Sequence, residues 1–160
     1  MGVIVLHTLI RAPIERCFDL SLSIDAHVAS TARTGERAVA GVTRGLIGLG
    51  QEVTWRARHF FVEQELTTRI TALDRPRHFR DSMVRGAFAR FDHDHDFEAE
   101  GECTRMTDRF DFDAPLGPIG RFADWLFLDR YMERFLQERN ELLRITAESD
   151  GWRRFLPEER

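Results

Sequence analysis

The chain has 160 residues, with 23 basic and 27 acidic side chains and a net charge of -4. It contains no lysine, so every basic residue is an arginine, which excludes a Schiff-base lysine, a lysine general base and a phosphate-loop lysine. Hydrophobic residues make up 42% of the chain, which is typical of a folded protein. The two signs of charge are mixed along the chain, and without a basic face we expect no nucleic-acid partner.

The two cysteines, Cys17 and Cys103, have neither zinc-site nor redox-motif spacing. We interpret them as two buried thiols in a reducing compartment, with one long-range disulfide as the alternative. The N-terminus has no signal-peptide pattern, and no apolar run approaches the roughly 18 residues of a membrane span. We therefore expect a cytoplasmic protein without a transmembrane segment. Homodimer formation stays open.

The first third of the chain predicts one strand, two short helices and a second strand. Residues 3–11 are β-branched and aliphatic, which favours a strand. Pro13 suits the first turn of a helix over 13–20, and a second helix is expected over 24–32. A strand over 36–40 then leads into an apolar, glycine-rich stretch at 41–50. We interpret this stretch as a loop that is either a gate over a ligand site or a partner surface.

The middle of the chain predicts a meander. Strands are expected over 51–60, 62–73, 78–86, 90–99 and 102–113, and the short turns between them imply antiparallel pairing. Residues 118–147 then carry apolar side chains at a spacing of three and four, which predicts a long helix. We expect one domain over 1–148 and a tail over 149–160, in which Trp152, Phe155 and Leu156 either dock on the body or fray.

A curved antiparallel sheet around one long helix often keeps an interior that side chains do not fill. The expected fold is therefore α+β and container-like, and a container suggests a small ligand.

The segment Phe91-Asp92-His93-Asp94-His95-Asp96-Phe97 is the most informative in the chain. Successive residues of a strand face opposite sides, so the phenylalanines place His93 and His95 on the inner face and the aspartates on the solvated face. A turn centred near residues 100–101 would set His93 opposite Asp108. A turn at 86–89 would set Asp81 opposite His95 and Met83 opposite His93. We therefore predict an inward cluster of Asp81, His93, His95 and Asp108.

Three interpretations of this cluster compete. It is a satisfied polar ladder that lines a cavity, because buried carboxylates need partners. Alternatively it orients a ligand or performs acid–base chemistry, with a histidine as the base and an aspartate holding its tautomer. The third interpretation is a metal site, although three firm ligands do not emerge from the sequence. We predict neither a metal nor another cofactor.

Other side chains supply candidates for a cavity lining. Trp55 and His59 share the alternation of the inward residues in their strand. Most arginines of the meander should lie on the solvated face. One that points inward, with Arg85 as the candidate, would hold a ligand carboxylate. The full predicted lining is Trp55, His59, Met83, Phe91, His93, His95, Phe110, Phe122, Leu126 and Tyr131.

Several motifs resemble the START-like (SRPBCC) superfamily, within it a group of small stand-alone bacterial proteins described as polyketide cyclase/dehydrase-like. They are Leu9-Ile10-x-Ala12-Pro13-x-Glu15-x-x-Phe18-Asp19, Phe79-x-Asp81-x-Met83-Val84-x-Gly86, Phe91-x-His93-x-His95-x-Phe97, Met106-Thr107-Asp108 and Pro115-Leu116-Gly117. The resemblance covers residues 2–147. One departure is Gly86-Ala87-Phe88, where the group often has Gly-Pro-Phe.

The resemblance implies a helix-grip fold, in which a curved antiparallel sheet wraps the C-terminal helix around a hydrophobic cavity. It implies binding of a lipid or polyketide-like molecule, for transport or sensing, and transfers no catalytic residue. The alternative function is a cyclase or dehydratase in which His93 or His95 moves a proton with the support of Asp108 or Asp81.

Overall fold

The computed structural model describes residues 2–59, 61–114 and 123–157, with the backbone alone for 123–126. The elements follow the predicted order: β1 (Gly2–Ile10), α1 (Ile14–Leu22), α2 (Ile24–Ser30), η1 (Ala32–Thr34), β2 (Arg37–Gly41), β3 (Glu52–His59), β4 (Val62–Asp74), β5 (His78–Arg85), β6 (Arg90–Glu100), β7 (Cys103–Asp113), α3 (Ala123–Glu148) and η2 (Asp150–Arg154). The predicted helix start at residue 118 lies outside the described residues.

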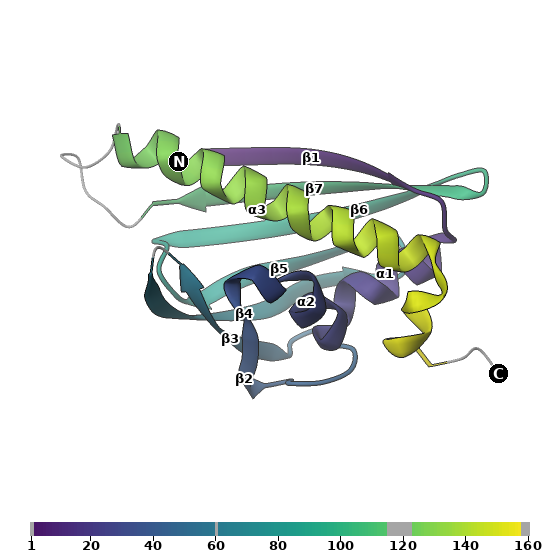
Figure 1. Cartoon of the computed structure of the whole chain (residues 1–160), viewed down its shortest axis with the longest axis horizontal. Helices are drawn as coiled ribbons and strands as arrows, with labels where there is room; N and C mark the ends of the chain where they lie inside the picture. The colour runs from purple at the N-terminus through teal and green to yellow at the C-terminus, as the bar shows by residue number, and fades with distance from the viewer. Residues whose placement is uncertain (1, 60, 115–122, 158–160) are drawn as a thin grey trace.

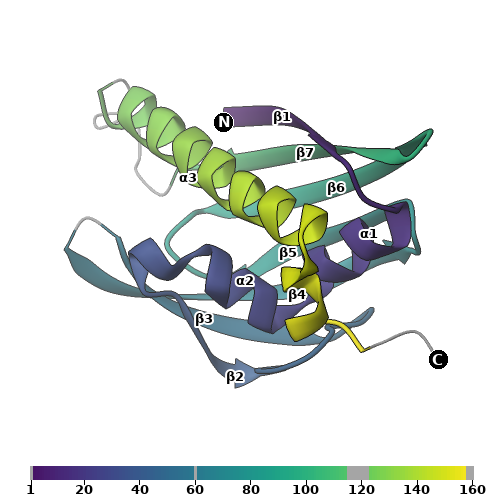
Figure 2. The same ribbon diagram turned by 45° about the vertical axis from the view of Figure 1, so that its right-hand side comes forward.

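The seven strands form one antiparallel sheet in the order β1-β7-β6-β5-β4-β3-β2. The long helix α3 crosses one face of this curved sheet, beside α1 and α2 (Figures 1 and 2). Side chains buried between the helices and the sheet form two apolar clusters. One surrounds Phe18 and Phe97, and the other surrounds Phe91, Phe110 and Leu136. The molecule is therefore a helix-grip fold, as the sequence predicts.

Local chemistry explains where the short helices begin. Pro13, with φ -60°, precedes α1, where its missing N–H is no loss. Ser23 caps α2, because its side chain accepts a hydrogen bond from the Ala26 N–H at 3.2 Å. These two short helices stand against the sheet beside α3, and Phe18 of α1 makes edge-on ring contacts with Phe79 and Phe97.

The predicted strand register is wrong by two residues on both sides of β6. His93 pairs with Phe110 and His95 with Asp108, because the β6–β7 turn is the two-residue Gly101-Glu102 and lies further along the chain than expected. Across β5, Asp81 pairs with His93, because pairing ends at Ser82 and Asp92 before the connecting loop. A shift of two residues keeps every side chain on its predicted face.

The apolar loop between β2 and β3 is fastened to the body by backbone hydrogen bonds. Ile47 donates to the Leu22 carbonyl at 3.1 Å, Ile24 donates to Gly45 at 2.9 Å, and Gly50 donates to the carbonyl of Ile70 at 2.8 Å. Ile47 is buried in the core. The loop therefore packs across the α1–α2 junction and reaches β4.

The structure also tests the expectations for the two cysteines and for the C-terminal tail. Both cysteines are free thiols, so the alternative of a disulfide is wrong, and Cys103 is half-buried where a buried thiol was expected. The described part of the tail docks on the body, with Leu156 buried and Trp152 packed against the same core. No helix in the described part of the chain is long and apolar enough to cross a membrane.

Candidate functional site

The four predicted polar residues meet on the inner face of the sheet. His93 and His95 come from β6, Asp81 from β5 and Asp108 from β7. His95 Nε2 lies 3.1 Å from Asp81 Oδ1, and His93 Nε2 lies 3.0 Å from Asp108 Oδ1. These are the two pairs that the sequence placed together, although each joins diagonal neighbours instead of register partners. We refer to the four residues as the His–Asp cluster.

The cluster is enclosed by aromatic rings and lies beside the second apolar cluster. His95 stacks on Phe79 with ring centroids 4.2 Å apart, and His93 lies 5.3 Å from the ring of Phe110. His95 and Asp108 are each 1% exposed, whereas the side chain of Asp81 is 20% exposed. Asp81 is therefore the cluster member most open to another molecule.

Burial and hydrogen bonding act in opposite directions on the pKa values of the two carboxyl groups in the cluster. Burial acts to raise the pKa of Asp108, but the hydrogen bond from His93 and the close contact with His95 outweigh it and hold that pKa well below its usual range. The pKa of Asp81 is also lowered, because the hydrogen bond from His95 and nearby positive charges outweigh its burial. Both carboxylates are therefore ionised at neutral pH.

The two histidines shift in opposite directions. Burial lowers the pKa of His93, and the charge of His95 lowers it further. Burial acts in the same direction on His95, but the Asp108 carboxylate 2.8 Å from its Nδ1 and its hydrogen bond to Asp81 raise its pKa. His95 is thus the histidine that takes a proton first, and His93 stays neutral as the pH falls toward the ordinary histidine value of 6.5.

Helix α3 contributes two polar residues that the sequence analysis missed. Asn140 donates a hydrogen bond from Nδ2 to Asp108 Oδ2 at 2.6 Å, and the neighbouring Arg139 is only 7% exposed. The positive charge of Arg139 helps to lower the pKa of both Asp81 and His95. The signal was present in the sequence, because both residues lie on the helical stripe between Leu136 and Leu143.

The cluster has the donor types of a metal site, but its interactions favour a hydrogen-bonded network. Ligand atoms of Asp81, His93 and His95 lie within 4.8 Å of one another. However, Asp81 Oδ1 is already engaged by His95, both nitrogens of His95 lie within 3.1 Å of a carboxylate oxygen, and the guanidinium of Arg139 is a nearby cation. That charge disfavours a divalent ion.

A second polar group lies where β2 and β3 approach α2 and α3. His59 Nδ1 is 2.7 Å from the hydroxyl oxygen of Tyr131, which brings two of the predicted lining residues together. Next to them, His27 stacks on the predicted lining residue Trp55 at 4.2 Å and pairs with the buried Glu36 at 3.2 Å. Sequence reasoning missed the pair of His27 and Glu36, because neither residue stands in a recognisable pattern.

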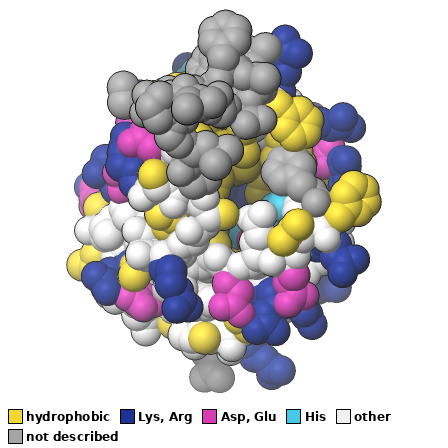
Figure 3. All heavy atoms as spheres, turned by 90° about the vertical axis from the view of Figure 1, so that its left-hand side faces the viewer, with side chains coloured by type: hydrophobic (Ala, Val, Ile, Leu, Met, Phe, Trp, Pro, Cys, Tyr) yellow, Lys and Arg dark blue, Asp and Glu magenta, His cyan; other side chains and the backbone are white. Residues whose placement is uncertain are grey.

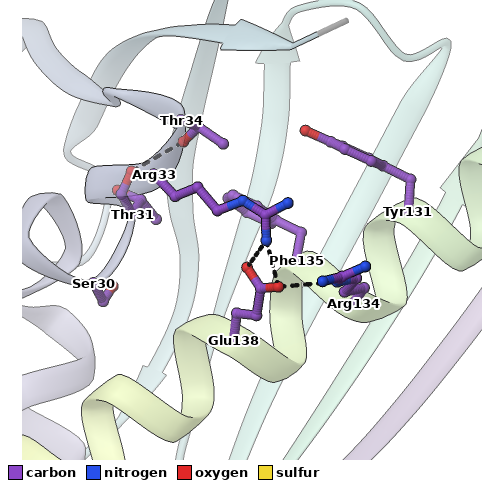
Figure 4. A pocket seen from close by; sticks show the side chains of 8 residues that line it. All are labelled: Ser30, Thr31, Arg33, Thr34, Tyr131, Arg134, Phe135 and Glu138. Atoms are coloured by element: carbon purple, nitrogen blue, oxygen red, sulfur yellow. Dashed lines mark hydrogen bonds and ion pairs between the residues drawn. The ribbon is translucent and has the colours of Figure 1, made fainter.

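A cavity of about 140 Å³ opens between η1 and α3. Its lining side chains are Ser30, Thr31, Arg33, Thr34, Tyr131, Arg134, Phe135 and Glu138 (Figure 4). Arg33 donates to both carboxylate oxygens of Glu138 at 2.6 and 2.8 Å, and Arg134 donates to the same carboxylate at 3.0 Å. Viewed from the end where α3 begins, hydrophobic side chains and a histidine are visible in a hollow of the surface (Figure 3).

The remaining predicted lining residues divide into two groups. Met83, Phe91 and Phe110 belong to the apolar cluster beside the His–Asp cluster. Phe122 and the side chain of Leu126 lie outside the described residues. The arginine predicted to point inward, Arg85, does not: its side chain is 75% exposed and lies 4.0 Å from Glu65. The arginine that is buried among the described residues is Arg139.

The architecture matches solved structures over nearly its whole length. A protein from Thermus thermophilus superposes with a TM-score of 0.71 at 18% identity, over 92% of this chain and 100% of that one. A START superfamily protein from Mycobacterium smegmatis gives 0.70 at 10% identity, over 91% and 97%. The major latex-like protein 151 of Panax ginseng gives 0.67 at 15% identity, over 92% and 98%. These identities establish a shared fold.

No curated protein sequence matches the chain. The family model described as polyketide cyclase/dehydrase and lipid transport matches residues 5–148, which includes both the His–Asp cluster and α3. The chain therefore belongs to this START-like family, and its curved sheet and long helix form a hydrophobic-ligand-binding helix-grip fold.

Proposed function

We propose that the protein binds a small hydrophobic molecule, such as a lipid or polyketide-like compound, between the sheet and α3 in the cytoplasm. The observation that supports this proposal best is that the His–Asp cluster lies beside the apolar cluster that contains Phe91 and Phe110. Phe91 and Phe110 supply an apolar wall, with Met132 and Phe135 of α3 packed against it. A largely apolar site with a few fixed polar groups is the usual form of a small-molecule site.

In this proposal the polar end of the ligand meets Asp81. Its carboxylate is the most exposed of the cluster and only accepts hydrogen bonds, so it selects a ligand hydroxyl or another donor. His95, Asp108 and Asn140 hold the cluster in place from behind, because they are buried and bonded to one another or to Asp81. Their role is to position Asp81 and His93.

Native mass spectrometry of the purified protein tests for a co-purified lipid or aromatic compound. Binding is then measured with N-phenylnaphthylamine, an uncharged apolar probe that fluoresces when it leaves water. Met132→Trp should fill space under α3 and weaken probe binding, whereas Leu142→Trp adds the same ring at a position that is 44% exposed. Equal probe binding by both variants, or no binding by the wild type, would count against the proposal.

A second candidate function is a cyclase or dehydratase, and His93 is the residue that favours it. Its Nε2 is held by Asp108, its lowered pKa keeps it neutral, and its Nδ1 makes no hydrogen bond within the described part of the chain, the nearest carboxylate being Asp81 at 3.9 Å. His93 is thus the better general base of the two histidines.

The bound compound identified by mass spectrometry is the substrate for this second test. An enzyme would convert it, with loss of water or a new ring, and His93→Gln would slow that conversion at least about a hundredfold while the compound still binds. Unchanged mass and spectrum of the compound after prolonged incubation with the wild type would reject catalysis and leave the binding function.

A further inference from the structure

Arg139 is a buried cation that lacks a direct partner. It lies on α3, is only 7% exposed, and makes neither a hydrogen bond nor an ion pair with any residue in the described ranges 2–59, 61–114 and 123–157. Many other arginines of the chain are bonded to acids at the surface, such as Arg80 to Asp94 and Arg144 to Glu141. Among the described residues, His95 Nδ1 is the one fully enclosed side-chain polar atom without a hydrogen bond, so the guanidinium nitrogens of Arg139 keep a small accessible surface. Its N–H donors can therefore reach another molecule.

Arg139 lies on the turn of α3 that faces the His–Asp cluster. The next residue, Asn140, hydrogen-bonds Asp108 at 2.6 Å, so this turn of α3 faces the sheet at the His–Asp cluster. The charge of Arg139 acts on Asp81 and His95, from β5 and β6. The guanidinium therefore lies near the cluster but outside direct bonding distance of its carboxylates.

The charges of the cluster explain how Arg139 is tolerated there. Asp81 and Asp108 are ionised, and a proton taken up by His95 balances only one of the two negative charges. Arg139 balances the other through space, which leaves its planar fork of donors free for another molecule. The planar fork suits anions that can present two oxygen atoms side by side, such as carboxylates, sulfonates and phosphates.

We propose that Arg139 binds an anionic head group of the hydrophobic ligand, so that the protein selects amphipathic acids over uncharged molecules of the same shape. This inference rests on the proposed function, because the apolar part of such a ligand would occupy the space between sheet and α3. Asp81 then accepts from a hydroxyl of the ligand while Arg139 donates to its acidic group.

Two fluorescent probes that share one ring system test the inference. Anilinonaphthalene sulfonate carries an anionic group, and N-phenylnaphthylamine is the same skeleton without it. In Arg139→Gln, the affinity for the sulfonate should fall by about 10- to 100-fold, the value of a lost charged hydrogen bond, while the affinity for the uncharged probe stays within about twofold. Arg109→Gln is the control, because Arg109 is 51% exposed on the opposite face of β7.

A second variant tests the inference in case Arg139→Gln does not fold. Arg139→Lys keeps the charge but loses the fork, and it should lower sulfonate affinity by several-fold without affecting the uncharged probe. If the variants weaken both probes equally, or neither, the anionic preference is wrong and the proposed function stands. If neither probe binds the wild type, the proposed function itself fails, and the inference with it.

Discussion

Asp81 and His93 face each other directly across β5 and β6, yet Asp81 accepts its hydrogen bond from His95, two residues further along the strand. The same diagonal step joins His93 to Asp108 on the other side of β6. The cluster therefore ties three strands together, and Asn140 extends it to α3. It fixes the position of the helix over the sheet as well as the register of the strands.

Asp108 should be the most costly member of the cluster to replace. It accepts hydrogen bonds from His93 at 3.0 Å and Asn140 at 2.6 Å, and it is 1% exposed. Asp108→Asn removes the buried charge that these donors and His95 face, and we expect a loss of about 3–5 kcal/mol in the free energy of unfolding. Asp96→Asn, on the exposed face of β6, should change it by less than about 0.5 kcal/mol. Urea denaturation of both variants checks this, and equal midpoints would contradict it.

The histidines should respond to pH in opposite ways. The pKa of His95 is raised, so its contribution to stability is complete below the unfolded value of 6.5 and is lost as the pH rises through the folded pKa. The pKa of His93 is lowered, so its contribution is present above 6.5 and is lost as the pH falls through the folded pKa. Imidazole NMR titration should therefore place His95 above His93.

Stability measurements over about pH 5 to 8 give the second check of this assignment. The stability difference between wild type and His95→Gln should narrow toward the alkaline end, whereas that for His93→Gln should narrow toward the acidic end. The assignment of the proton to His95 is wrong if the two differences follow the pH in the same direction.

Two glycines with nearly the same positive φ should tolerate alanine very differently. Gly41 has φ 73° and Gly45 has φ 71°, a region that costs other residues about 1–2 kcal/mol. A Cβ at Gly45 would meet open space, but at Gly41 it would collide with the backbone carbonyl of Glu52. Gly41→Ala should therefore cost a further ~1–3 kcal/mol of overpacking. Thermal unfolding of both variants measures the difference. Similar melting temperatures would show that β2 shifts away from Glu52 without a loss of stability.

The two thiols should differ in reactivity in the folded protein. Burial raises the pKa of Cys17 to about 11, so its thiolate is scarce at neutral pH. Cys103 is half-buried next to the β6–β7 turn. Iodoacetamide should modify Cys103 in the native protein and reach Cys17 only after unfolding, as peptide mass analysis would show. Early modification of Cys17 would mean that α1 opens readily from the sheet.

Strand and helix positions could be predicted because burial imposes a strict period on the chain. The alternation of Phe91, His93, His95 and Phe97 determined which face turned inward, and face assignment survives an error of two residues in pairing. The register itself could not be derived, because it depends on where each turn is centred. The turn at Gly101 is short and the connection after Ser82 is long. The alternation of inward and outward residues does not predict either length.

The helix side of the site was harder to predict for a different reason. Arg139 and Asn140 are polar residues in a helix rich in charge, and such residues normally face water. Asn140 is buried because Asp108 of β7 accepts its hydrogen bond, and Arg139 is buried near the charged groups of β5 and β6. These strands are far away from α3 in the sequence. The polar residues of the strands were found because phenylalanines flank them, whereas the inward arginine was sought among the strands at Arg85.

The pairing of β1 has a consequence for how the chain folds. Gly2 pairs with Phe112 and Ile10 with Thr104, and within the described residues β1 is an edge strand whose one neighbour is β7. During synthesis the first strand emerges long before its partner exists, and α3, which contacts it, follows later still. Closing so large a loop carries a high entropic cost before any contact forms. The helix-grip container can therefore be completed only after α3 has been synthesised, and late, slow pairing of β1 with β7 and α3 is the expected course of folding.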